Sequence, residues 1–312
     1  MKSSLLDVAV VVLNYNGWED TIACAESLLL LSPSPRFIII VDNASTNKSK
    51  IHISEWMNNK SGSIQFKSAD ANTALSTSFK PARINLVTAD KNLGYAAGNN
   101  IGIKIAMQHG AKAVWILNND TLVFPDTLGA LWTRLNNAPR PGLCGALVRY
   151  FDEPNVVQCM GGGRTSRATG LSTLAGQGYS VDQAKAIPTE EVEKNINFIY
   201  GASVLASRNF ISTVGLMDER YFLYCEEQDW AFSANGKFNI SYAKDAEILH
   251  REGRSSTWSR KHRSLIGFYR IARSRILLAA KFHPWFIPTV MFSLIYALAR
   301  LAARSLVKTK SS

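Results

Sequence analysis

The sequence predicts an α/β fold with a mainly parallel central sheet flanked by helices. Short apolar runs rich in β-branched residues alternate along the first 120 residues with segments of helical character, and this alternation is typical of parallel sheets. Polar residues follow the apolar runs, at the sheet edge where α/β proteins bind ligands. With 46% hydrophobic and 19% charged residues, the 312-residue chain also has enough apolar side chains for a sizeable core.

The first half gives the clearest strand and helix signals. Residues 8–13 form a continuous apolar run, which predicts a strand buried on both faces. A turn signal follows at 14–17, and 18–31 predicts a helix ended by the Ser-Pro repeat at 32–35. The same pattern predicts strands at 37–41, 84–87 and 113–117, helices at 47–59 and 99–108, a Gly-containing loop at 92–98, and a surface excursion at 60–82.

The second half is less regular. Apolar runs predict strands at 143–148, 196–206, 238–243 and 247–249. The polar, Gly-rich and Thr-rich stretch at 161–194 predicts a mobile loop over the site. An acidic helix start lies within 222–236, and 261–281 predicts a basic helix.

Composition excludes several classes of protein. Disordered, collagen-like and low-complexity chains do not have this apolar content. The four cysteines form no C-x-x-C pair, which argues against a disulfide scaffold and a cysteine-rich zinc site. The N-terminus lacks the features of a secretory leader, so we expect a cytosolic, reducing location.

The excess positive charge is confined to the C-terminal segment. Residues 251–312 hold 13 Lys and Arg and one acid, whereas residues 1–250 hold 22 basic and 23 acidic residues. The segment also contains an uncharged, largely apolar run at 282–299, which nucleic-acid-binding tails rarely have. This run predicts an interfacial helix on an anionic membrane surface and no nucleic-acid partner; a single membrane span and a helix packed on the protein's own core are the alternatives.

Two polar clusters close predicted strands in the first half. Asp42 can accept hydrogen bonds from a nucleobase or a ribose, although a helix cap explains the same residue. Asp120, which follows Asn118 and Asn119, can hold a divalent cation if substrate phosphates complete the oxygen shell. Ordinary turn chemistry is the alternative at this corner.

Two further clusters lie in the second half. Glu226, Glu227 and Asp229 crowd three carboxylates together, which favours either a general base with a raised pKa or a dipole-stabilised helix start. His250 ends an apolar strand and stands beside Arg251 and Arg254 in a Gly-containing loop. Such a loop favours diphosphate or metal binding.

Six segments, in order, resemble the family 2 inverting glycosyltransferases, which have a GT-A nucleotide-sugar-binding fold. The resemblance is closest to the rhamnosyltransferase-like branch that builds bacterial surface polysaccharides. The segments are VVVLNYNGWED (10–20), VDNASTN (41–47), NLGYAAGNN (92–100), LNNDT (117–121), MDERYFLYCEEQDW (217–230) and HREGRS (250–255). The resemblance implies a transferase domain at 1–256, with a nucleotide-binding half at 1–122 and an acceptor and catalytic half at 123–256, followed by basic amphipathic membrane-associating helices at 257–312.

The resemblance also implies residue roles. Donor-binding positions are matched by Asn14, Tyr15, Asp42, Asn92, Gly94, Gly98, Asn118 and Arg254. Asp120 and His250 match positions that meet Mg²⁺ or Mn²⁺ on the donor diphosphate, although this chain has asparagines at 118 and 119 and keeps one acid there. Glu227 matches the catalytic base, where Asp is the commoner residue, and Glu226 and Asp229 are the alternatives. We therefore expect Asp42, Asp120, Glu227 and His250 to surround one cavity.

The implied activity is metal-dependent inverting transfer of a sugar, with L-rhamnose a candidate, from a dTDP- or UDP-linked donor. The acceptor would be a hydroxyl of a glycan or of a polyprenyl-diphosphate-linked glycan, at the inner face of the cell membrane. One alternative is a UDP-hexose or UDP-N-acetylhexosamine transferase of the same fold. An alternative from another class is a non-catalytic protein that binds anionic lipid or polymer.

Overall fold

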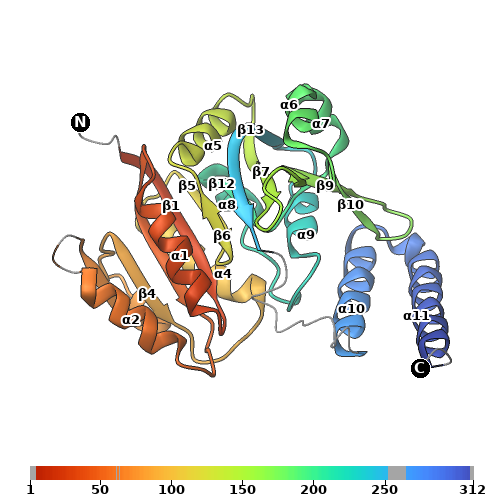
Figure 1. Cartoon of the computed structure of the whole chain (residues 1–312), viewed down its shortest axis with the longest axis horizontal. Coiled ribbons are helices and arrows are strands. Elements are labelled where there is room, and N and C mark those ends of the chain that lie inside the picture. Colours follow the sequence, from red (N-terminus) through yellow and green to blue (C-terminus); the bar gives the residue numbers. More distant parts are fainter. Residues whose placement is uncertain (1–4, 61, 63, 252–264, 310–312) are drawn as a thin grey trace.

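The computed structural model describes residues 5–60, 62, 64–251 and 265–309 (Figure 1). The strands are β1 (Leu5–Asn14), β2 (Ser34–Asp42), β3 (Phe66–Asp70), β4 (Ile84–Thr88), β5 (Ala113–Asn118), β6 (Thr121–Val123), β7 (Pro141–Tyr150), β8 (Val157–Met160), β9 (Gly162–Thr165), β10 (Ser172–Leu174), β11 (Phe198–Ile199), β12 (Ser203–Ser207) and β13 (Asn239–His250). The helices are α1 (Trp18–Leu29), α2 (Ser49–Lys60), α3 (Ala71–Ala74), α4 (Tyr95–Gln108), α5 (Thr127–Asn136), α6 (Val181–Ala186), α7 (Thr189–Asn195), α8 (Arg208–Val214), α9 (Glu226–Ser233), α10 (Leu265–Phe282) and α11 (Ile287–Thr309).

The central sheet confirms the predicted fold class. Its strand order is β3-β4-β2-β1-β5-β12-β7-β13-β6, with β8 paired to β7. The first five strands in this order are parallel, so their carboxyl ends meet at one edge. Strand β12 runs antiparallel to both β5 and β7 and joins the two halves into one sheet.

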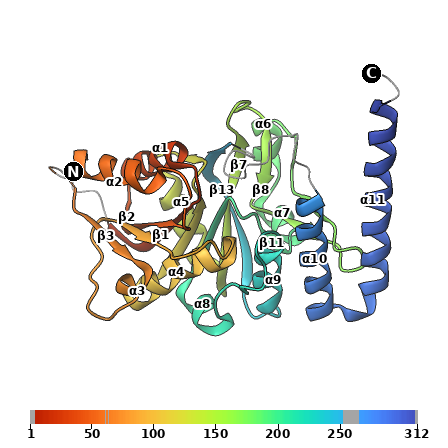
Figure 2. The same ribbon diagram turned by 90° about the horizontal axis from the view of Figure 1, so that it is seen from below.

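Both faces of the sheet are covered, which explains the uninterrupted apolar runs. In β1, Val8, Val10 and Val12 pack in a core with α1, α2 and α5. Their neighbours Ala9 and Val11 pack in a second core with α4, α8 and α9. Figure 2 shows these two helix layers above and below the sheet. Since side chains alternate across a strand, a strand buried on both sides must be apolar at every position.

Two expectations for the first half are corrected. Residues 60–82 contain β3, which pairs with the edge of β4, and the short helix α3. An edge strand can form through backbone hydrogen bonds without an apolar pattern, so its sequence gave no signal. Helix α4 begins at Tyr95, so Gly98 lies in the helix and not in the preceding loop. A Cβ at Gly98 would stand 2.5 Å from Leu13 Cδ1, which explains a glycine where α4 crosses β1.

The second half differs from the sequence in three places. The segment 161–194, expected as a mobile loop, contains β9, β10, α6 and α7. The expected strand at 196–206 is divided into β11 and β12, because the chain turns at 200–202. The two expected short strands at 238–249 are one strand, β13, whose register is irregular between Ala243 and Glu247.

Helices α10 and α11 pack on each other and on the segment that leads into α9. Ala279 of α10 and Val290 and Leu294 of α11 form a small buried cluster. A second cluster joins Leu278 of α10 to Tyr221, close to the start of α9. Among the residues described, no helix combines the length and the apolar character needed to cross a membrane.

Candidate active site

A cavity of about 900 Å³ lies at the carboxyl ends of β1, β2 and β5 and extends to α9 and α10. One side is formed by residues that follow the parallel strands, and the other by α10 and the segment leading into α9. Its polar lining residues include Tyr15, Asn43, Asn92, Asn118, Asn119, Tyr200, Glu226, Glu227, Gln228, Arg270 and Arg275. The sheet edge at which the sequence predicted a ligand is therefore hollow.

Two adjacent carboxyl groups enter the cavity from the first turn of α9. Glu226 and Glu227 follow Tyr224 and Cys225, whose φ angles of 73° and 69° are unusual for residues other than glycine. Glu227 lies against the turn between β11 and β12, and a Cβ at Gly201 would be 1.8 Å from its Oε1. Glycine at 201 thus gives the Glu227 carboxyl room beside the backbone.

Burial makes both carboxyl groups weaker acids. Desolvation raises the pKa of Glu227 to about 7. Desolvation, together with the charge of Glu227, raises the pKa of Glu226 well above its usual range. The Oε2 atom of Glu226 is buried and has no hydrogen-bond partner. Glu227 can therefore exchange a proton near neutral pH, and burial disfavours a second negative charge on Glu226 beside it.

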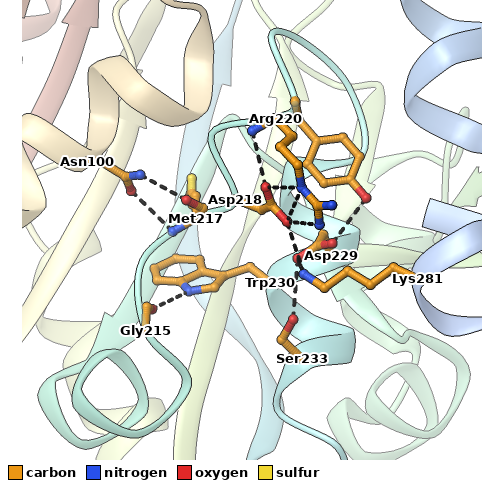
Figure 3. A network of polar contacts seen from close by, with 10 residues as sticks. Asn100, Gly215, Met217, Asp218, Arg220, Asp229, Trp230, Ser233 and Lys281 are labelled. Carbon is orange, nitrogen blue, oxygen red and sulfur yellow. Dashed lines mark hydrogen bonds and ion pairs between the residues drawn. The ribbon is translucent and has the colours of Figure 1, made fainter. Parts of the chain in front are cut away.

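Asp229, the third member of the acidic cluster, does not line the cavity. It accepts hydrogen bonds from the Tyr221 hydroxyl at 3.0 Å and from Lys281 of α10 at 2.8 Å. Ser233 contributes a longer bond of 3.3 Å. Figure 3 shows Lys281 and Ser233 beside the Asp229 carboxylate. The oxygens of Asp229 are thus used to join α9 to its neighbours.

Asp120 and His250 form a buried pair behind the cavity wall. His250 Nε2 lies 3.2 Å from Asp120 Oδ1 and 3.4 Å from the Nδ2 of Asn118, which lines the cavity. The other ring nitrogen of His250, Nδ1, is 2.8 Å from Gln158 Oε1. Because Gln158 Oε1 can only accept, Nδ1 donates to it, which leaves Nε2 facing Asp120 and the Asn118 amide.

Asp120 and His250 together fit a divalent cation whose remaining ligands come from a substrate. The imidazole and the carboxylate supply two suitable donors, and Gln158 orients the imidazole as outer-shell groups do in metal sites. Across the described ranges, no group of three or more His, Cys, Asp or Glu side chains is arranged to hold a metal. Phosphate oxygens would therefore have to complete the shell.

Asn14 and Asp42 stabilise the loops that support the cavity and do not line it. Asn14 Nδ2 donates to Asp42 Oδ1 at 2.6 Å, and Ser45 Oγ donates to the same oxygen. The neighbours Tyr15 and Asn43 line the cavity instead. Of the four residues expected around one cavity, Glu227 lines it, His250 of the Asp120–His250 pair contacts Asn118 in its wall, and Asp42 is not among the lining residues.

The loop before α4 contacts the segment before α9. Asn43 Nδ2 donates to Asn92 Oδ1 at 3.0 Å and to the Gly94 carbonyl at 3.1 Å. Gly94 has a φ of 95°, and a Cβ there would be 2.2 Å from the Phe222 carbonyl oxygen. Sequence reasoning placed Asn92 and Gly94 at the site, and both line the cavity. Arg254, also expected at the donor, lies outside the described residues.

Sequence reasoning missed several lining residues. Tyr200, whose ring meets that of His250 edge to face at 6.0 Å between centroids, and Gly201 both lie in the run expected as one strand. The glycine within that run was the available signal, because glycine inside a strand pattern often marks a break or a close approach. Tyr95 was also missed; its hydroxyl donates to the Gly201 carbonyl at 2.8 Å.

Comparison with known proteins places this site in context. Residues 9–159 match the family described as Glycosyl transferase family 2. The chain is 19% identical over 254 residues to the low-salt glycan biosynthesis hexosyltransferase Agl10 of Haloferax volcanii, covering 80% of this chain and 69% of that protein. It is 26% identical over 186 residues to an N-acetylglucosaminyl-diphospho-decaprenol L-rhamnosyltransferase of Mycobacterium tuberculosis, covering 55% of this chain and 60% of that protein.

Solved structures share the fold. The mannosyltransferase PcManGT of Pyrobaculum calidifontis, in complex with GDP-Man and Mn²⁺, superposes with a TM-score of 0.55 at 17% identity, over 98% of this chain and 79% of that one. S. aureus TarS 1-349 in complex with UDP gives a TM-score of 0.51 at 14% identity, over 88% of this chain and 66% of that one. At these identities the likeness concerns the fold alone.

Proposed function

Because the chain belongs to glycosyl transferase family 2, we propose that it transfers a sugar from a nucleotide diphosphate donor to an acceptor hydroxyl with inversion at the anomeric carbon. The observation that carries the proposal is the Glu227 carboxyl, which lines the cavity beside Gly201 with its pKa raised to about 7. A base with this pKa is available at neutral pH and still basic enough to accept a hydroxyl proton.

In the proposed reaction Glu227 accepts the proton of the acceptor hydroxyl. The acceptor oxygen forms a bond to the anomeric carbon, and the bond from that carbon to the donor diphosphate breaks with its electron pair leaving on the nucleotide. Burial and the charge of Glu227 also raise the pKa of Glu226, which disfavours a second negative charge beside the base.

The donor is proposed to lie along the ends of β1, β2 and β5. Tyr15, Asn43 and Asn92 line this part of the cavity and would contact the nucleoside. Asp120 and His250 would hold Mg²⁺ or Mn²⁺, which would neutralise charge on the leaving diphosphate. Asn118 lies between this pair and the cavity, where its amide would contact the donor.

The substrates proposed are a dTDP- or UDP-linked hexose, L-rhamnose among them, and a hydroxyl of a glycan or lipid-linked glycan. Support comes from the two curated relatives, a hexosyltransferase and a rhamnosyltransferase that acts on a diphospho-decaprenol-linked sugar. A peripheral position on an anionic membrane surface is proposed from the basic C-terminal segment and from exposed apolar side chains of α11.

The proposal is tested by replacing Glu227 with glutamine in a donor screen. Purified protein is incubated with dTDP-rhamnose, UDP-hexoses and UDP-N-acetylhexosamines and a lipid-linked acceptor mixture, and products are identified by mass spectrometry. We expect one donor to give a product, Glu227→Gln to abolish it, and calorimetry to show that the variant still binds the donor. Near-normal turnover by Glu227→Gln would remove Glu227 from the role. Transfer from no donor would favour a non-catalytic anion binder.

A further inference from the structure

We propose that Arg270 and Arg275 of α10 form a second anion subsite of the cavity, which binds the diphosphate of a prenyl-linked acceptor. The inference rests on the proposed glycosyl transfer and adds the residues that would bind the diphosphate of the acceptor. It is carried by two arginines that line the cavity from α10, whereas the proposed donor-binding residues line it from the strand ends.

Arg275 is a buried cation with unused hydrogen-bonding capacity. Only 6% of its surface is exposed, and its Nη2 donates to the Thr169 carbonyl and to Ser293 Oγ, both of which are neutral. Its Nε has no hydrogen-bond partner, and no carboxylate of the described residues forms an ion pair with it. Burying an unpaired charge is costly, so a guanidinium kept in this position indicates an anionic ligand.

Arg270 stands one and a half turns earlier on the same helix. Its guanidinium carbon lies 4.4 Å from the centroid of the Phe222 ring, which holds the group at the cavity wall by a cation–π contact. None of the ion pairs within the described part of the chain involves Arg270. A planar guanidinium stacked in this way keeps its N–H edge free for phosphate oxygens.

The two arginines are separated from the proposed donor diphosphate site. Asp120 and His250 lie behind the end of β5, whereas the arginines enter from α10, which is on the far side of α9 from the nucleotide-binding half (Figure 2). Glu227 is on α9, between these two regions. An acceptor whose diphosphate met the arginines could thus present a sugar hydroxyl to Glu227 while the donor approached from the other side.

The same helix offers a route for a lipid chain. Ile266 and Tyr269 of α10 are each 63% exposed, and Tyr269 directly precedes Arg270. Helix α11 also exposes apolar side chains, among them Phe292 and Ile295, which are 71% and 63% exposed. A prenyl group leaving the arginines along α10 would therefore reach an apolar surface suited to a membrane.

The test measures binding of farnesyl diphosphate, farnesol and inorganic pyrophosphate to the full chain by calorimetry, without a donor. We expect farnesyl diphosphate to bind at least about tenfold more tightly than farnesol, because charge-assisted hydrogen bonds form only with the diphosphate. Arg275→Gln and Arg270→Gln should each weaken it by about tenfold and leave the affinity for UDP and dTDP unchanged. Arg300→Gln, which removes the same charge from the exposed face of α11, should have no effect.

Two outcomes would overturn the subsite. One is unchanged farnesyl diphosphate affinity in both arginine variants, with Arg270→Gln deciding if Arg275→Gln fails to fold. The other is competition between farnesyl diphosphate and UDP or dTDP, or a parallel loss of nucleotide affinity, since either would assign the arginines to the donor diphosphate. If farnesyl diphosphate binding depends on the two arginines but the protein transfers no sugar, the subsite is supported and the proposed transfer is rejected.

Discussion

Lys281 of α10 donates a hydrogen bond to the Asp229 carboxylate of α9 at 2.8 Å and a second one to Asp218 at 3.1 Å (Figure 3). Asp229 is two residues beyond Glu227 on the same helix. A hydrogen bond from Arg220, and a smaller contribution from Lys281, hold the pKa of Asp218 well below its usual range. The C-terminal helices are therefore fastened to the helix that carries the proposed base.

We expect Lys281→Met to lower both stability and turnover. The side chain of Asp229 is 3% exposed and would keep only hydroxyl partners, while that of Lys281 is 32% exposed, so we expect a loss of about 1–3 kcal/mol in the free energy of unfolding. Lys104→Met removes an exposed ion pair with Glu219 at 3.8 Å and should change stability by less than about 1 kcal/mol. Equal effects of the two variants in urea titrations would contradict the argument.

The pH dependence of kcat/KM should report Glu227. A general base acts when deprotonated, and its pKa here is raised to about 7, so the rate should rise with pH and level off above this value. Below it we expect a fall of about tenfold per pH unit. Glu226→Gln should keep the midpoint, because burial, and not the charge of Glu226, raises the pKa of Glu227. A rate independent of pH between about 5 and 7 would exclude Glu227 as the base.

Metal binding should depend on Gln158. Its Oε1 is 2.8 Å from His250 Nδ1 and fixes the direction of Nε2 toward Asp120. We expect chelator to stop turnover, and Gln158→Leu to raise the Mn²⁺ concentration needed to restore it by about 10-fold to 100-fold. Gln177→Leu, at an exposed residue bonded to Tyr150, is the matched control. Full activity in excess chelator would show that no metal is used.

The exposed apolar side chains of α11 should bind membranes. Phe292 of α11 is 71% exposed, and Trp285, in the turn just before α11, is 85% exposed. We expect Phe292→Asp to weaken sedimentation with phosphatidylglycerol vesicles by about tenfold, and removal of 282–312 to leave the protein in the supernatant. Ile51→Asp on α2, where the side chain is 54% exposed, provides a control for added charge. Unchanged pelleting after the deletion would contradict membrane binding through this segment.

The sequence alone did not distinguish Glu227 from Asp229 as the candidate base. The sequence places three carboxylates within four positions, and in the structure all three lie in the first turn of α9. Residues two apart are separated by about 200° around a helix axis, so these two acids must face opposite sides. Which side faces the cavity depended on α10, since Lys281 reaches Asp229 from 52 residues away in sequence.

The sequence by itself determined the parallel half of the sheet and the edge at which its polar residues gather, because burial on both faces requires unbroken apolar runs and leaves polar residues to the strand ends. Tertiary structure alone decided which polar side chains reach the cavity. Asn14 and Asp42 hydrogen-bond to each other and do not line it, whereas Gly201, from a run predicted as one strand, and Arg275, from the predicted basic helix, lie in its wall. The physical reason is that a motif specifies residue types at chain positions, while exposure to a shared cavity depends on contacts between segments far apart in sequence.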